Sequence, residues 1–171
     1  MEVQYRIGEL LKQKGETLSA AESCTGGQIS HLITMVSGSS SYYLGSVTSY
    51  AIKIKESVLG VPGELIREHG VVSSEVAAAM AEGVRKLCGS TYSVATTGLA
   101  EGGDERYREG TVWMGVSGPK GTETRIFHCD LGRKGNIRRF AKAALEFLES
   151  YIKNSTELAI NQQKKHFCLY L

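Results

Sequence analysis

The amino-acid sequence predicts an α/β fold with three layers, in which a mixed sheet of about four or five strands lies between helices. Segments with the apolar spacing of helices alternate along the chain with short segments rich in branched and aromatic residues, and no internal repeat is visible. The chain has 171 residues, of which 42% are hydrophobic, so it is long enough to bury the core of one domain.

Helices are predicted where apolar residues recur every three or four positions. Ile7 and Leu11 follow this spacing and Gly15 is a stop signal, which predicts a first helix over residues 2–14. A buried segment then runs from Leu18 through a glycine pair into the next helix. The further helices are predicted over residues 29–36, 51–59, 62–69, 74–88 and 133–151.

Strands are predicted where aromatic and branched residues are concentrated in short segments, as in Tyr42–Tyr50. Others are predicted over residues 92–97, 111–116 and 122–129. The short connection between the last two indicates an antiparallel hairpin. The polar residues 101–110 indicate a surface loop that borders a site.

One domain is predicted over residues 1–151. From Ile152 onward the helical period is lost and residues 161–165 are polar, so residues 152–171 are predicted to form a tail that is either loosely attached or disordered.

The charge of the chain is balanced: twenty Lys and Arg residues oppose eighteen Asp and Glu residues, which gives a net charge of +2. This balance does not indicate electrostatic binding of nucleic acid. No apolar run reaches the length of a membrane span, and the first residues lack the pattern of a signal peptide. We therefore expect a soluble, cytoplasmic protein with neither nucleic acid nor membrane as a partner.

The cysteines indicate neither a disulfide framework nor a zinc site, because their spacing fits neither. They are Cys24, Cys88, Cys129 and Cys168. We expect reduced thiols, no metal site and no cofactor. Cys24 alone lies beside a candidate site, and as a nucleophile it would need a histidine partner. The sequence does not decide among His31, His69, His128 and His166, although His31 lies too far along its helix to be a good candidate.

The stretch Leu18–Gly27 contains the main candidate site. Thr25 can cap the following helix, while Gly26 and Gly27 leave its first N–H groups uncovered in front of Ser23. Such a turn binds an oxyanion or a phosphate. The alternative is a capped turn whose glycines only allow close packing. We expect the site where the turns after Ala20, Tyr50 and Thr97 meet, because ligands bind at such strand ends.

Several motifs occur in an order that resembles the C-terminal domain of the CinA family of competence-damage inducible proteins. The resemblance covers roughly residues 5–150. The motifs are AESCTGG (21–27), GSS (38–40), the stretch ending at Tyr50 with Lys55 five residues later, LGVP (59–62), HGVVSSEVA (69–77), TTGLA (96–100) and GTV (110–112), with Arg133 and Arg138. The family includes deamidases that hydrolyse nicotinamide mononucleotide to nicotinic acid mononucleotide and ammonia.

The resemblance implies a serine–lysine mechanism without a cofactor. Ser23 would be the nucleophile, Lys55 the base, and Tyr50 would pass or orient protons. Thr97 and Gly98, with the turn of Thr25, Gly26 and Gly27, would face the substrate, and Arg133 or Arg138 would bind the phosphate of a mononucleotide. We also expect a homo-oligomer, either a dimer or a trimer.

Two positions depart from the family pattern. Ile52 replaces a polar asparagine, and we expect it to be buried and to desolvate Lys55. Glu101 adds a negative charge near the presumed phosphate site. Two other functions therefore remain open: a nucleotide-binding or regulatory domain in which Ser23 only binds phosphate, and an interaction module that docks through an apolar strand edge such as residues 42–50.

Overall fold

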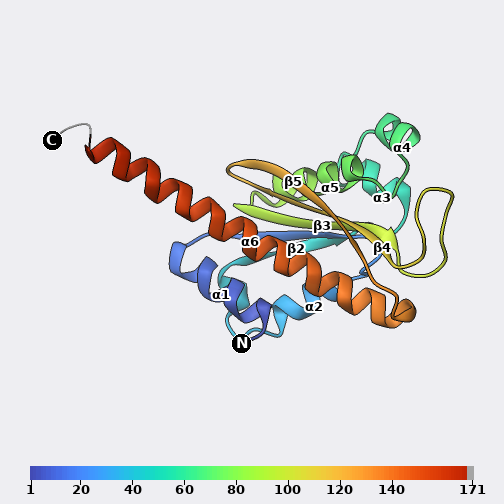
Figure 1. Ribbon diagram of the computed structural model, residues 1–171, viewed down its shortest axis with the longest axis horizontal. Coiled ribbons are helices and arrows are strands. Elements are labelled where there is room, and N and C mark those ends of the chain that lie inside the picture. Colours follow the sequence, from blue (N-terminus) through green and yellow to red (C-terminus); the bar gives the residue numbers. More distant parts are fainter. Residues whose placement is uncertain (169–171) are drawn as a thin grey trace.

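The computed structural model describes the backbone of residues 1–168 and the side chains of residues 1–155. The described chain contains one five-stranded sheet with the order β2-β1-β3-β4-β5 (Figure 1). Its strands are β1 (Leu18–Glu22), β2 (Tyr43–Thr48), β3 (Tyr92–Leu99), β4 (Thr111–Gly118) and β5 (Gly121–His128). Strand β1 pairs in parallel with β2 and β3, whereas β4 is antiparallel to β3 and β5. The predicted mixed sheet and hairpin are confirmed.

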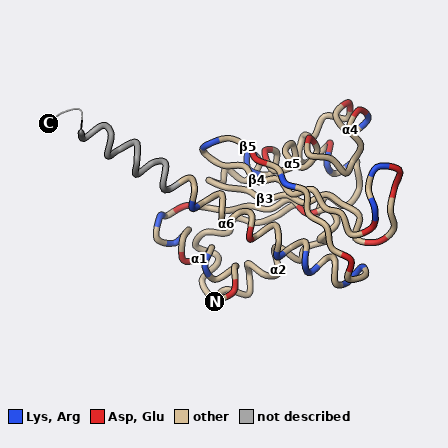
Figure 2. Tube along the Cα trace, in the orientation of Figure 1, with Lys and Arg blue, Asp and Glu red and all other residues tan. Residues whose placement is uncertain are grey.

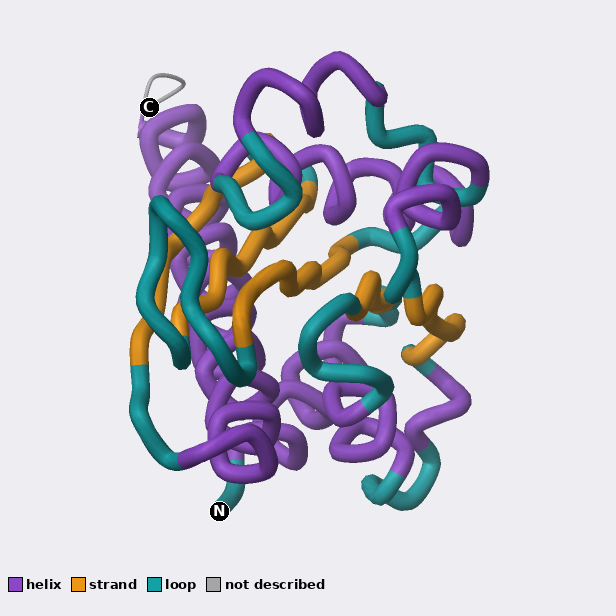
Figure 3. The backbone as a smooth tube through the Cα atoms, turned by 90° about the vertical axis from the view of Figure 1, so that its right-hand side faces the viewer, coloured by secondary structure: helices purple, strands orange, loops and turns teal. Residues whose placement is uncertain are grey.

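Helices cover both faces of this sheet, as the views in Figures 1 and 3 show. On one face lie α1 (Val3–Lys14), α2 (Gln28–Thr34) and α6 (Gly132–Cys168), which pack against one another. On the other lie α5 (Ser74–Cys88), α3 (Ile52–Ser57) and α4 (Gly63–His69). A 3-10 turn, η1 (Ser39–Ser41), precedes β2. The three-layer prediction is therefore confirmed.

The core is divided by the sheet into two clusters, because successive side chains of a strand point to opposite faces. In β1, Ala20 lies in the cluster beneath α1, α2 and α6, and its neighbour Ala21 lies in the cluster beneath α5. Val94 and Ala95 of β3 divide in the same way. The central strands are thus buried on both faces, so a polar residue within them needs internal hydrogen bonds.

A partly buried ion pair joins the first and last helices. Arg6 on α1 donates from Nε and Nη2 to the two carboxylate oxygens of Glu149 on α6, at 2.9 and 2.6 Å. Lys153, one turn further along α6, donates to Glu149 Oε1 at 2.6 Å. The hydrogen bond from Arg6 is the main cause that lowers the pKa of Glu149 to about 2. The carboxylate therefore stays charged at any ordinary pH.

The last helix is longer than predicted. Helix α6 passes through Tyr151 without a break, and the side chain of Ile152 is fully buried in the core. Ile152 follows Leu148 by four positions, so it continues the apolar stripe of the helix. Residues 152–155 thus belong to the packed helix rather than to a loose tail. The side chains of residues 156–168 and all of residues 169–171 lie outside the described part, as do the thiol of Cys168 and the ring of His166.

The length and the apolar character of a helix decide whether it could cross a membrane. Within the described residues, no helix combines the length and the apolar character that crossing a membrane requires.

Candidate active site

A cavity of about 290 Å³ opens at the carboxyl ends of the parallel strands. Ser23 enters it directly after β1, Tyr50 and Lys55 follow β2, Thr97 and Gly98 end β3, and Arg133 comes from the start of α6. Three turns far apart in sequence meet there because parallel strands present their carboxyl ends at the same sheet edge. The cavity therefore lies where the sequence predicted a site.

The central contact in the cavity joins Ser23 and Lys55. Lys55 Nζ lies 2.8 Å from Ser23 Oγ and also donates to the backbone carbonyl of Ser49. The lysine comes from α3, and only 1% of its surface is exposed. Among the described residues, the hydrogen-bond partners of Lys55 Nζ are a hydroxyl and a carbonyl and include no carboxylate, so burial disfavours the charged form of the lysine.

The environment of Lys55 changes its acidity in the direction that catalysis needs. Burial lowers the pKa of the ammonium below its ordinary value of 10.5, an effect that the thiolate form of Cys24 would partly oppose. A neutral amine has two N–H groups and one lone pair. If the Ser49 carbonyl accepts one N–H, the lone pair is free to accept the proton of Ser23. The pair can therefore work as a nucleophile and its base.

Cys24 is not suited to be the nucleophile. Cys24 is only 8% exposed and packs in the hydrophobic core, and burial raises the pKa of its thiol to about 12. A thiol with such a pKa is protonated at neutral pH. Among the described side chains that line the cavity there is no histidine to activate it. The alternative of a cysteine–histidine system therefore has no support in this geometry.

The first turn of α2 is occupied by a carboxylate from the protein itself. Glu22, the last residue of β1, is fully buried and accepts from the N–H groups of Gly27, Ile29 and Ser30 at 2.9–3.0 Å. The hydroxyls of Thr25 and Ser30 also donate to it, both at 2.7 Å. An acidic side chain at a helix N-terminus is stabilised by those N–H groups and by the helix dipole.

This cap changes the role predicted for the glycine turn. Gly27 is the N-cap of α2, and its N–H group is bound to Glu22 rather than free for an external anion. Thr25 does not cap the helix, because its buried hydroxyl pairs with Glu22 and with Thr96 Oγ1 at 2.8 Å. Thr25, Gly26 and Gly27 are not among the residues that line the cavity. The signal that could have indicated the cap is an acidic residue at the end of a fully buried strand, directly before the glycine turn.

Arg133 contacts two other residues that line the cavity. Its Nη2 donates to the hydroxyl of Tyr50 at 3.0 Å, and its Nη1 lies 3.8 Å from Glu101 Oε2. Tyr50 is 63% exposed, so it stands at the mouth and not in the core. These residues provide a cation, an anion and a phenol at the entrance.

Thr97 and Gly98 line the cavity as predicted, but each also has a structural role. The Thr97 hydroxyl donates to the carbonyl of Val71 at 2.7 Å. A β-carbon at Gly98 would lie only 2.4 Å from the carbonyl oxygen of Thr111 on β4. Only glycine therefore allows β3 and β4 to pair this closely at this position.

Two further predictions differ from the structure. Arg138 faces another hollow of about 320 Å³, with His31 and Lys142, because it lies more than one helical turn beyond Arg133 on α6. It is therefore not a phosphate ligand for the Ser23 cavity. Ile52 lines the cavity but is 47% exposed, since it is the first residue of α3 and lies at the surface. The burial of Lys55 does not require a buried Ile52.

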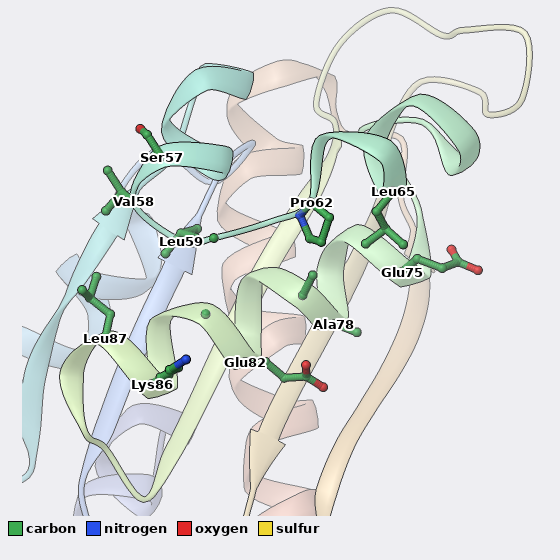
Figure 4. A pocket seen from close by; sticks show the side chains of 13 residues that line it. Ser57, Val58, Leu59, Pro62, Leu65, Glu75, Ala78, Glu82, Lys86 and Leu87 are labelled. Atoms are coloured by element: carbon green, nitrogen blue, oxygen red, sulfur yellow. The ribbon is translucent and has the colours of Figure 1, made fainter.

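A larger hollow of about 800 Å³ lies between α5 and the segment that joins α3 to α4 (Figure 4). Leu59, Pro62, Leu65 and Leu87 give it an apolar surface, with Glu75 and Glu82 toward one side. It contains no contact between a nucleophile and a base comparable to that of Ser23 and Lys55 among the described residues. Within residues 1–155, no three His, Cys, Asp or Glu side chains are grouped as a metal site would require.

The comparison with protein families agrees with this architecture. Residues 1–152 match the CinA C-terminal domain. The chain belongs to the CinA C-terminal domain family. A CinA-like protein of Salinibacter ruber is 48% identical over 142 residues, which are 82% of this chain and 34% of that protein. A CinA-like protein of Cytophaga hutchinsonii is 39% identical over 153 residues, which are 88% of this chain and 37% of that protein. The chain thus spans about a third of the length of these CinA-like relatives.

Solved structures of the CinA superfamily share the fold. The competence/damage inducible protein CihA from Agrobacterium tumefaciens has a TM-score of 0.83 at 30% identity, over 86% of this chain and 92% of that one. A CinA superfamily protein from Klebsiella pneumoniae has a TM-score of 0.85 at 25% identity, over 89% and 96%. The resemblance inferred from the ordered motifs is therefore confirmed at the level of family and fold.

Proposed function

We propose that this CinA domain is an amide hydrolase in which Ser23 is the nucleophile and Lys55 is the general base. The observation that carries the proposal is the 2.8 Å contact between Lys55 Nζ and Ser23 Oγ, made by a lysine whose pKa is lowered by burial. The chain belongs to the CinA C-terminal domain family, and the amide hydrolysis that this family resemblance implies agrees with the Ser23–Lys55 chemistry.

The reaction has two halves. Ser23 Oγ attacks the carbonyl carbon of the amide while Lys55 accepts its proton, and Lys55 then gives that proton to the departing nitrogen, which leaves as ammonia. This produces an ester between the substrate's acyl group and Ser23. Lys55 next takes a proton from a water molecule that attacks the ester, and returns it to Ser23 as the carboxylic acid leaves. Both residues end in their initial state.

The substrate we propose is nicotinamide mononucleotide, which the resemblance implies. A cavity of about 290 Å³ is at the small end of the range for ligand sites, so it suits a compact amide with part of the ligand at the mouth. Arg133 lines the cavity with a side chain that is 47% exposed, so it would offer a guanidinium for the phosphate at that mouth. Tyr50, bound to Arg133, would then help to orient the ligand.

The test is release of ammonia from nicotinamide mononucleotide by the purified chain, compared with the Ser23→Ala variant. We expect steady release by the parent and a loss of about a thousandfold or more in the variant. Calorimetry with the variant measures binding of the mononucleotide separately. Tight binding without release by the parent would contradict hydrolysis and favour a nucleotide-binding domain.

A further inference from the structure

We propose that Glu101 controls the charge selectivity of the Ser23 cavity by competing with the phosphate of a mononucleotide for Arg133. This inference rests on the proposed function, because it concerns the ligand of the same site. It assigns a specificity role to Glu101, which lines the cavity and places a negative charge beside Arg133. Its consequence is that the chain discriminates weakly between a mononucleotide and the phosphate-free riboside.

The geometry places Glu101 where it can compete. Glu101 and Arg133 both line the cavity, and Glu101 Oε2 is 3.8 Å from Arg133 Nη1. The other terminal nitrogen, Nη2, donates to Tyr50. Both terminal nitrogens of the guanidinium therefore have protein partners. A phosphate that binds Arg133 in a bidentate manner must displace the Glu101 carboxylate or lie next to it.

The exposure of the two side chains makes the competition possible. The Arg133 and Glu101 side chains are 47% and 64% exposed, so this is a weak, solvated ion pair that an incoming group can separate. Glu101 lies at the start of the loop between β3 and β4, which carries both acidic and basic residues (Figure 2). It can move away from Arg133 without disturbing the buried core.

Charge then separates the two candidate ligands. Each contains a cationic pyridinium ring, but the mononucleotide adds a phosphate with nearly two negative charges. Arg133 and Glu101 are oppositely charged residues that both line the cavity, so their charges offset each other. The carboxylate therefore disfavours the phosphate and tolerates the cationic riboside. Removing the negative charge of Glu101 should therefore tighten the binding of the mononucleotide but not that of the riboside.

The experiment measures dissociation constants of the mononucleotide and of the riboside by calorimetry, in the full chain carrying Ser23→Ala so that neither ligand is consumed. Glu101→Gln should tighten mononucleotide binding about three- to tenfold and leave riboside binding nearly unchanged. Glu105→Gln is the matched control, because this exposed residue of the same loop does not line the cavity. It should change neither constant.

A second background tests the route through Arg133. When Arg133 is replaced by Ala, Glu101→Gln should change the logarithm of the mononucleotide dissociation constant by less than half as much as it does when Arg133 is present. An unchanged ratio of the two constants in Glu101→Gln, or an effect that persists in full without Arg133, would overturn the competition. The turnover assay of the parent is independent of these binding constants. If the parent releases no ammonia, hydrolysis is contradicted. If Glu101→Gln nevertheless tightens mononucleotide binding in the Ser23→Ala chain, the competition for Arg133 is supported.

Discussion

Lys55 Nζ lies 2.8 Å from Ser23 Oγ although the two residues are 32 positions apart in the chain. The contact exists because β1 and β2 are parallel neighbours, so the turn after β1 and the helix after β2 meet at the same edge of the sheet. Burial then favours the neutral amine that can accept a proton. The fold and the acidity of the lysine thus support the same chemistry.

Substitution of Lys55 tests whether it is a base or only a cation. Both Lys55→Ala and Lys55→Arg should lower kcat for ammonia release by about a hundred- to ten-thousandfold, because arginine keeps the charge but does not release its proton. Lys53→Arg, at an exposed position of the same helix, should retain the parent rate. Substantial turnover by Lys55→Arg would show that another group is the base.

The pH dependence of the rate follows from the lowered pKa of Lys55. The base acts only when neutral, so kcat/KM should rise with pH through that lowered pKa and level off before pH 10.5, the ordinary lysine value. The profile is best measured with an amide that lacks a phosphate, because the phosphate titrates near pH 6. A rate that begins to rise only near the ordinary lysine value would contradict a desolvated amine.

Removal of the buried cap tests the structural role of Glu22. Glu22→Ala leaves the N–H groups of Gly27, Ile29 and Ser30 without their acceptor, and should lower the free energy of unfolding by about 2–5 kcal/mol. Urea denaturation measures the change, with Glu9→Ala on the exposed face of α1 as the control, expected within about 0.5 kcal/mol of the parent. Equal effects of the two substitutions would refute the cap.

Acid stability should depend on the Arg6–Glu149 pair. The folded-state pKa of Glu149 is about 2, below the ordinary value of 4.5, so its contribution to stability is complete above pH 4.5 and is lost as the pH falls toward 2. Glu149→Gln should therefore weaken the dependence of the urea midpoint on pH in this window. A pH dependence identical to that of the parent would show that the pair does not stabilise the folded state.

The sequence predicted the architecture well because apolar periodicity reflects burial. It indicated the helices, the mixed sheet and the edge at which Ser23 lies, since each depends on local pattern and on the topology of parallel strands. The end of α6 was missed because Ile152 is followed by polar residues, which conceal the last buried position of the stripe.

The details of the site were less predictable, because they depend on which donors are already occupied. A glycine turn at a helix start looks the same whether its N–H groups are free or bound to Glu22. Arg133 and Arg138 are equivalent by sequence, but the rotation of a helix directs only Arg133 toward the cavity. Ile52 is apolar and yet half-exposed, since it begins a short helix at the surface.

The central claim is that Ser23 forms a covalent bond with the acyl group of the amide. It is tested most directly by acid quenching of the chain during turnover of nicotinamide mononucleotide, followed by mass spectrometry of the peptide that contains Ser23. We predict an acyl adduct on Ser23 in the parent, and neither adduct nor ammonia release in Ser23→Ala, with both proteins equally folded by circular dichroism. Ammonia release by Ser23→Ala at the parent's rate would contradict the account.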